Sequence, residues 1–193
     1  GISIAVGGDA ANQATALSCL GKKVSLITKL GDDMAGRLLL SHFREHDVFT
    51  GDSSIENGLD TAVNLVLIHP DAERSFVTNK NGSLRKLSPS DIPETALKKS
   101  PVFSFASIFV SPLFDIPAMI SLFRSIREKG GLLCADMTRR KNGESLEDLS
   151  PVLPYINWLF PNLQEARAVS GKNTPEEAAY CVPISAISVK RWD

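Results

Sequence analysis

Gly7-Gly8-Asp9-Ala10-Ala11-Asn12-Gln13-Ala14 is the stretch that decides the fold. It separates an extended apolar segment, residues 2–6, from a run of small residues with helical spacing. Glycine lets the backbone turn sharply and lets a bound molecule approach closely. Asn12, one turn into the predicted helix, offers both a hydrogen-bond donor and an acceptor. The stretch suits a polyhydroxylated ligand, and an ordinary strand-to-helix turn explains these eight residues equally well.

The residues that follow extend the pattern. Val24-Ser25-Leu26-Ile27-Thr28-Lys29-Leu30 is typical of a short apolar strand. Gly31-Asp32-Asp33-Met34-Ala35-Gly36 comes next, and a helix is predicted to run from there to about His46. The order strand, helix, strand, helix over residues 1–46 builds a parallel sheet covered by helices. We therefore predict an α/β fold.

Residues 47–85 have a different character. Two β-rich runs, 61–68 and 74–78, flank a polar turn and predict an antiparallel hairpin, which within a βα alternation indicates a separate small sheet. The loop after it carries Asn79 and Asn81, whose amides can bond hydroxyl groups, and Lys80, which can meet an anionic group. A plain polar turn is the alternative for this loop.

The βα alternation resumes after the hairpin. Strands are predicted at 102–110, 132–136 and 156–160, with a helix between the first two. We predict a mainly parallel sheet sandwiched by helices as the core, residues 1–46 and 86–193, and a small β-sheet lid region at 47–85.

Polar side chains follow two of these strands. Asp136 ends one strand, and Arg140 is close behind it with a planar fork that can pair with a phosphate. Pro161-Asn162-Leu163-Gln164-Glu165 closes the next strand and opens a helix. Ligands bind at this edge of open parallel sheets, and helix N-termini favour phosphate oxygens. A capped helix with an acid in its first turn is the alternative for Asn162 and Glu165.

Composition limits the classes of partner. A net charge of −1 gives no reason to expect nucleic acid or an anionic membrane surface as a partner. Cys19, Cys134 and Cys181 have no ligand-like spacing, and their odd number indicates reduced thiols in a cytoplasmic protein. The most apolar stretch, residues 102–114, is interrupted by a proline and is too short to span a bilayer.

The glycine motif, a helix, Leu20-Gly21, a strand and Leu30-Gly31-Asp32-Asp33 follow one another in an order that resembles the N-terminal signature of the ribokinase-like (PfkB) carbohydrate kinases. Pro161–Glu165 resembles the PN-x-x-E box of that family. The resemblance implies a kinase that uses ATP and Mg²⁺ to phosphorylate a sugar hydroxyl. It also implies that the hairpin is a lid over the sugar and a contact between the subunits of a homodimer.

Site residues are carried over from the family by position. The resemblance implies that the sugar is held by Gly7, Gly8, Asp9, Asn12, Asn79, Lys80 and Asn81. It implies that the donor phosphates meet Asp136, Arg140 and Asn162, and that Glu165 holds Mg²⁺ through water.

Three departures from the family pattern affect these expectations. The sequence contains no GAGD, the motif whose aspartate is the family's base, so no residue here is assigned as catalytic and the base is expected outside these residues. Residues 185–189 resemble a C-terminal helix of the family. Ribose-specific members have Lys at the position of Asp9 and an acid near Ser111-Pro112, so the sugar stays open.

The sequence raises two alternatives to a kinase. The first is a non-catalytic, sugar-binding or regulatory relative without the nucleotide half. The second, a dinucleotide-binding oxidoreductase, is disfavoured because no G-x-G-x-x-G follows a strand.

Overall fold

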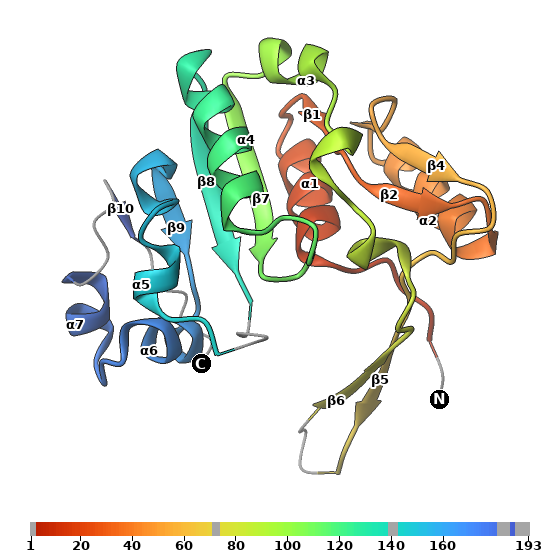
Figure 1. The fold of residues 1–193 in the computed structure, drawn as a ribbon. Coiled ribbons are helices and arrows are strands. Elements are labelled where there is room, and N and C mark those ends of the chain that lie inside the picture. Colours follow the sequence, from red (N-terminus) through yellow and green to blue (C-terminus); the bar gives the residue numbers. More distant parts are fainter. Residues whose placement is uncertain (1–2, 71–73, 139–142, 181–185, 188–193) are drawn as a thin grey trace. The chain divides into compact units, whose positions relative to one another are not determined.

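The computed structural model describes residues 3–70, 74–138, 143–180 and 186–187. The chain divides into two compact units, Gly1–Ile92 and Pro93–Asp193, and each is described by itself. Both contain parallel strands connected through helices (Figure 1), so the predicted α/β class is confirmed.

The first unit begins with two parallel strand pairs. Its elements are α1 (Asp9–Cys19), β1 (Val24–Ser25), β2 (Lys29–Gly31), α2 (Met34–Glu45), β3 (Val48–Phe49) and β4 (Ser54–Glu56). β1 pairs with β3 and β2 pairs with β4, both in parallel. Helix α2 lies between the partners in sequence and supplies the crossover that a parallel pair needs.

A small apolar core fixes α1 against these strands. Ala11 and Ala14 of α1 are buried together with Leu26, Phe43 and Val48. Alanine at both helical positions lets α1 approach its neighbours closely, and Phe43, which is 1% exposed, fills the space beneath them.

An antiparallel hairpin follows, as predicted. It consists of β5 (Asn64–Ile68) and β6 (Arg74–Thr78), with Asn64 opposite Thr78 and Ile68 opposite Arg74. The hairpin extends away from the other strands of its unit (Figure 1). Two 3₁₀ turns, Ser83–Arg85 and Pro89–Asp91, close the unit. The division of the chain into a core and a lid region at 47–85 stays a prediction.

The second unit is built on a four-stranded parallel sheet in the order β10-β9-β8-β7. Its elements are α3 (Glu94–Lys99), β7 (Val102–Ile108), α4 (Ile116–Glu128), β8 (Leu132–Met137), α5 (Leu146–Leu149), a 3₁₀ turn (Leu153–Tyr155), β9 (Trp158–Phe160), α6 (Leu163–Ser170), α7 (Pro175–Tyr180) and β10 (Ala186–Ile187). Helix α4 lies over β7 and β8 (Figure 1). Phe105 packs edge-on against Phe114 and Phe123, with ring centroids 5.2 Å apart in each pair.

Three local expectations were wrong. Residues 3–8 form no strand, because no strand in the described part of the chain pairs with them. The strand expected at 24–30 is two strands, since Ser53 Oγ donates to Leu26 O and accepts from Thr28 N between them. Ala186–Ile187 pairs in parallel with Trp158 and Leu159 instead of forming a helix, because ladder bonds override a weak local preference.

A partly buried ion pair joins β2 to the end of the first unit. Lys29 Nζ lies 3.0 Å from Asp91 Oδ1 and 3.1 Å from Glu56 Oε2, with side-chain exposures of 14%, 10% and 55%. Burial alone would raise the pKa of Asp91, but hydrogen bonds from Ser88 and Lys29 outweigh it and leave that pKa below its ordinary value. Hydrogen bonds to Asp91 and then Glu56 raise the pKa of Lys29.

These shifts predict acid sensitivity. A carboxyl group whose pKa is lowered by folding contributes stability above its ordinary pKa of 3.8, and that contribution is lost as the pH falls through the lower folded value. We expect Asp91→Asn to cost about 1–3 kcal/mol of unfolding free energy at pH 7. We also expect it to flatten the fall in stability as the pH drops below the ordinary pKa of 3.8.

Urea unfolding at several pH values measures this effect. Asp32→Asn is the matched control, because the Asp32–Arg37 pair is exposed and such pairs contribute about 0–1 kcal/mol. An Asp91→Asn variant with the stability and pH profile of the wild type would contradict the prediction.

Candidate functional site

The glycine motif forms a loop that opens helix α1. Gly8 has φ 100° and ψ 143°, a conformation that residues with a Cβ rarely adopt, and its carbonyl accepts from Asn12 N at 2.9 Å. A Cβ at Gly7 or Gly8 would meet nothing within 4 Å, so backbone conformation rather than space requires glycine at Gly8. Asp9 and Asn12 are exposed in the first turn of α1. The loop therefore presents polar side chains and helix N–H groups at one helix end.

The second motif, Gly31 to Gly36, is organised by the carboxylate of Asp33. Asp33 caps α2, and its Oδ1 accepts from Gly36 N at 2.7 Å and from Thr61 Oγ1 at 2.7 Å. Its Oδ2 accepts from Thr61 N at 2.8 Å. Thr61 Oγ1 in turn accepts from Gly31 N at 2.9 Å, and Thr61 is 2% exposed. The carboxylate thus joins the start of α2 to the residues that precede the hairpin.

The same contacts lower the pKa of Asp33 and leave no room for a side chain at Gly36. The Thr61 N–H, followed by the Gly36 N–H, holds the pKa of Asp33 below its ordinary value. A Cβ at Gly36 would overlap the carbonyl oxygen of Gly31 and lie 3.0 Å from Thr61 Oγ1. The helix that starts at this motif was predicted, but the capping role of Asp33 was not. An Asp three residues before a Gly at a helix start is the signal that predicts such a cap.

In the predicted substrate loop after β6, one polar side chain is hydrogen-bonded to the backbone before the hairpin and two are exposed. Asn79 Oδ1 accepts from Val63 N at 3.0 Å, and its Nδ2 donates to Thr61 O at 3.0 Å. Lys80 and Asn81 are exposed. Asn79 therefore ties the two hairpin strands together at their base, and its contact with a sugar stays a prediction, as do those of Lys80 and Asn81.

Two of the three predicted phosphate residues, Asp136 and Asn162, lie at the carboxyl edge of the sheet in the second unit. Asp136, 5% exposed, is opposite Phe160 in the β8–β9 register, and its Oδ1 accepts from Met137 N at 2.8 Å. Asn162 follows β9 by two residues, at the same edge. Arg140 lies outside the described residues.

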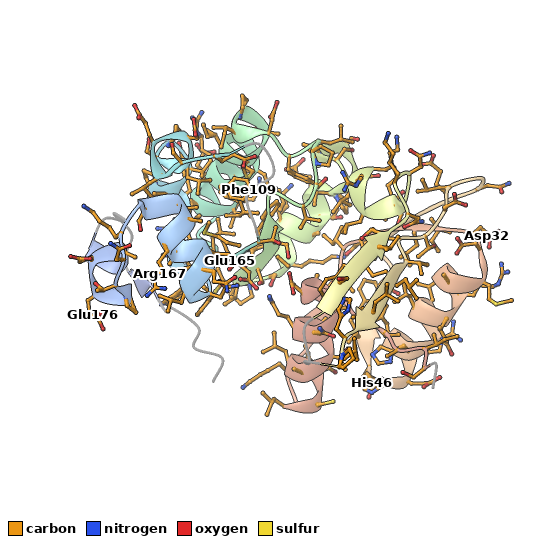
Figure 2. All side chains as sticks on the ribbon, turned by 90° about the horizontal axis from the view of Figure 1, so that it is seen from below. Asp32, His46, Phe109, Glu165, Arg167 and Glu176 are labelled. Atoms are coloured by element: carbon orange, nitrogen blue, oxygen red, sulfur yellow. The ribbon has the colours of Figure 1, made fainter. Side chains whose placement is uncertain are left out.

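Asn162 and Glu165 form a reciprocal cap on α6. Asn162 Oδ1 accepts from Glu165 N at 2.9 Å, and Glu165 Oε2 accepts from Asn162 N at 2.8 Å. Figure 2 shows Glu165 and Arg167 on this helix. The capped-helix alternative is therefore correct as a local description. It is compatible with a phosphate-binding role, because a capped N-terminus still carries the positive end of the helix dipole.

A magnesium ion would have few protein ligands here. Within residues 3–70, 74–138, 143–180 and 186–187, no group of three or more His, Cys, Asp or Glu side chains can hold a metal ion. Mg²⁺ commonly keeps several waters and binds through one or two carboxylates together with substrate phosphates. The Glu165 carboxylate at this sheet edge fits that water-mediated mode of binding.

The end of β7 is a feature that the sequence analysis missed. Ser107 and Phe109 have φ of 65° and 77°, and the register with β8 shifts between Phe105 and Ile108. Phe109 is labelled in Figure 2. Non-glycine residues with positive φ cluster at ligand sites, and this one lies at the same sheet edge as Met137. No residue type in this stretch signals a positive φ.

No helix in the part of the chain that the structure describes has both the length and the apolar character needed to cross a membrane.

The parallel α/β fold, the glycine loop before α1 and the capped helix after β9 together define the class of ribokinase-like proteins. Comparison with solved structures agrees with the fold. A PfkB protein from Polaromonas sp. JS666 superimposes with a TM-score of 0.80 at 21% identity, over 93% of this chain and 64% of that chain. A fructokinase from Xylella fastidiosa solved with bound ATP superimposes with a TM-score of 0.72 at 22% identity, over 89% of this chain and 56% of that chain.

The particular family follows from the sequence comparison. The family model described as pfkB family carbohydrate kinase matches residues 1–189, and this chain belongs to that family. Fructokinase-1 of Zea mays is 33% identical over 138 residues, which are 71% of this chain and 43% of the maize protein. The match thus spans less than half the length of the plant fructokinases, 43% in maize and 42% in Arabidopsis thaliana.

Proposed function

We propose that this protein is a kinase that transfers phosphate from ATP to a sugar hydroxyl in the presence of Mg²⁺. The observation that carries the proposal is the match to the carbohydrate kinase family over residues 1–189. The fructokinase names of the relatives make a fructose-like ketose the first substrate to test.

On the substrate side, Gly7 and Gly8 allow a sugar to approach the backbone, and Asp9 and Asn12 bind its hydroxyls. The exposure of both side chains in the first turn of α1 supports these roles. Asp9 accepts hydrogen bonds from hydroxyl groups, whereas Asn12 both donates and accepts. Asn79, Lys80 and Asn81 complete the sugar site after the hairpin, and Lys80 is suited to a substrate that carries an acid group.

On the donor side, Asn162 and the N-terminus of α6 bind phosphate oxygens. Asp136 borders the same strand ends, Arg140 follows it in sequence and is proposed to pair with a phosphate, and Glu165 holds a water of the magnesium ion. When bound, Mg²⁺ neutralises charge on the phosphates during transfer. These residues position the donor, because phosphoryl transfer depends mainly on alignment and charge neutralisation. The base that accepts the hydroxyl proton is expected outside these residues.

The hairpin is proposed as the lid over the sugar. A lid excludes water, which would otherwise accept the phosphate in place of the sugar. The hairpin side chains are apolar and exposed on both faces, with Val66 and Phe76 on one and Leu65 and Val77 on the other. Exposed apolar strands of this kind also support pairing with a second copy, so we propose a homodimer formed through the hairpin. A cytoplasmic location is proposed from the cysteine content.

The activity is tested by ADP release from ATP and Mg²⁺ with a panel of D-fructose, D-ribose, 2-dehydro-3-deoxygluconate and a nucleoside. We expect ADP release that depends on one class of sugar. Asp9→Ala should raise KM for that sugar about 10–100-fold, the loss expected for a hydrogen bond to a charged group. Asp32→Asn, which alters an exposed ion pair, should leave KM unchanged.

Two outcomes would overturn the kinase proposal. One is sugar binding by calorimetry with no ADP release and no effect of ATP, which would identify a non-catalytic sugar-binding protein. The other is the absence of binding to every member of the panel.

The dimer is tested by sedimentation velocity of the wild type and of Leu65→Lys, whose side chain is exposed on β5. We expect a concentration-dependent dimer in the wild type and a monomer in the variant, because a charge on an apolar strand face opposes pairing. A wild type that stays monomeric at all concentrations would contradict the proposed dimer.

A further inference from the structure

The root of the hairpin differs in its bonding from the rest of the hairpin. We define the root as residues 60–63 and 79–83, the two segments next to β5 and β6. Within it, Ser83 Oγ accepts from Ala62 N at 3.2 Å, and Ser83 N donates to Asp60 O at 2.8 Å. Ser83, like Thr61, is 2% exposed. The two segments of the root are therefore cross-linked, with Thr61 and Ser83 buried between them.

Asn79 closes the root. Its side-chain amide bonds the backbone of both Thr61 and Val63. Gly82 passes close to this amide, where a Cβ would lie 2.6 Å from Asn79 Oδ1 and 3.0 Å from Ala62 Cα. The chain that enters the hairpin and the chain that leaves it are held together before the first residue pair of the ladder, Asn64 and Thr78.

Asp33 attaches this root to the body of its unit. One carboxylate accepts all three hydrogen bonds, two donated by Thr61 and one by Gly36. The start of α2 and the root therefore share one anchor. The negative charge strengthens all three, since hydrogen bonds to an ionised acceptor are about twice as strong as neutral ones. Gly31 N–H also donates to Thr61 Oγ1, which adds β2 to the same anchor.

The hairpin beyond the root lacks comparable support in the described residues. The β5–β6 ladder holds it, together with side-chain bonds between Thr78 and Asn64 and between His69 and Ser75, all of them exposed. Phe76 and Ile68 are 61% and 74% exposed. Regions with few buried apolar contacts and solvent-exposed backbone bonds open at low free energy.

We propose that Asp33 is a positioning residue for the lid. By fixing Thr61, it sets the direction in which the hairpin leaves the unit and confines lid motion to residues beyond Val63 and before Asn79. Asp33 acts through Thr61 and the root, with no contact to substrate. The effect on hairpin motion is independent of the activity, whereas the effect on sugar binding rests on the proposed function.

The first test is hydrogen–deuterium exchange of the whole protein, followed on peptides from β5, β6, β1 and α6. Thr61→Val removes the hydroxyl while keeping the shape of the side chain, and Thr61→Ser restores the hydroxyl. Thr61→Val removes the bond to Asp33 Oδ1 and the bond accepted from Gly31 N. We expect this variant and Asp33→Asn to speed exchange in β5 and β6 at least about tenfold, the equivalent of one buried hydrogen bond. We expect Thr61→Ser and the neighbouring Asp32→Asn to resemble the wild type.

The exchange results decide between positioning and general stability. Faster exchange confined to β5, β6 and the root supports the proposal. Unchanged exchange of β5 and β6 in Thr61→Val, or an equal increase in β1, would overturn it. Equal acceleration in β1 and β5 of Asp33→Asn would show that this variant does not fold stably. In that case the comparison of Thr61→Val with Thr61→Ser alone tests the positioning role.

The second test separates this proposal from the kinase proposal. With the sugar that supports ADP release, Thr61→Val should raise KM for the sugar about tenfold and leave KM for ATP unchanged, and Thr61→Ser should restore the wild-type value. Equal changes in both KM values would overturn the positioning role. A wild type without activity would contradict the proposed function, and the exchange data would still decide the role of Asp33 in the hairpin.

Discussion

The hydrogen bonds between the Asp33 carboxylate and Thr61 are the constraint on which the first unit depends. The same carboxylate accepts from the Gly36 N–H at the start of α2, which would otherwise lack a helical partner, and its bonds from Thr61 bring residue 61 to the end of β2. The approach is so close that Gly31 and Gly36 leave no room for a side chain. The cap of α2 and the hairpin root therefore share one carboxylate as their anchor.

In the second unit, strand register rather than a shared carboxylate brings polar residues together. Its parallel strands end at one edge, and the polar residues that follow them are brought together by the register, as with Asp136 and the residues after Phe160. The Asn162–Glu165 cap orders the N-terminus of α6 through hydrogen bonds within the helix. A helix end ordered in advance presents its dipole to a phosphate without further loss of conformational entropy. Ser107 and Phe109, the positive-φ residues at the end of β7, lie along the same edge, and residues in this conformation cluster at ligand sites.

The sequence was sufficient for those features that depend on local chemistry. Alternating βα patterns predicted the parallel sheets, and the β-rich runs around residue 70 predicted the hairpin. Asn162 and Glu165 were predicted as either a cap or a phosphate site, and the structure contains the cap. Features that depend on distant partners were missed. The Asp33–Thr61 bonds join residues 28 positions apart, the two-residue strand β10 exists only through its pairing with β9, and the positive φ of Phe109 follows from a register shift.

We propose that the glycine loop forms part of a sugar-binding site and that the hairpin covers this site. The most direct test is a two-dimensional ¹H–¹⁵N NMR titration of the wild-type protein with D-fructose, D-ribose and 2-dehydro-3-deoxygluconate. We expect one of the sugars to perturb, in a saturable manner, the amide signals of the glycine loop, Gly7, Gly8, Asp9 and Asn12. The same sugar should also perturb signals from β5 and β6. Saturable binding that leaves the glycine-loop signals unchanged, or no perturbation by any of the three sugars, would contradict it.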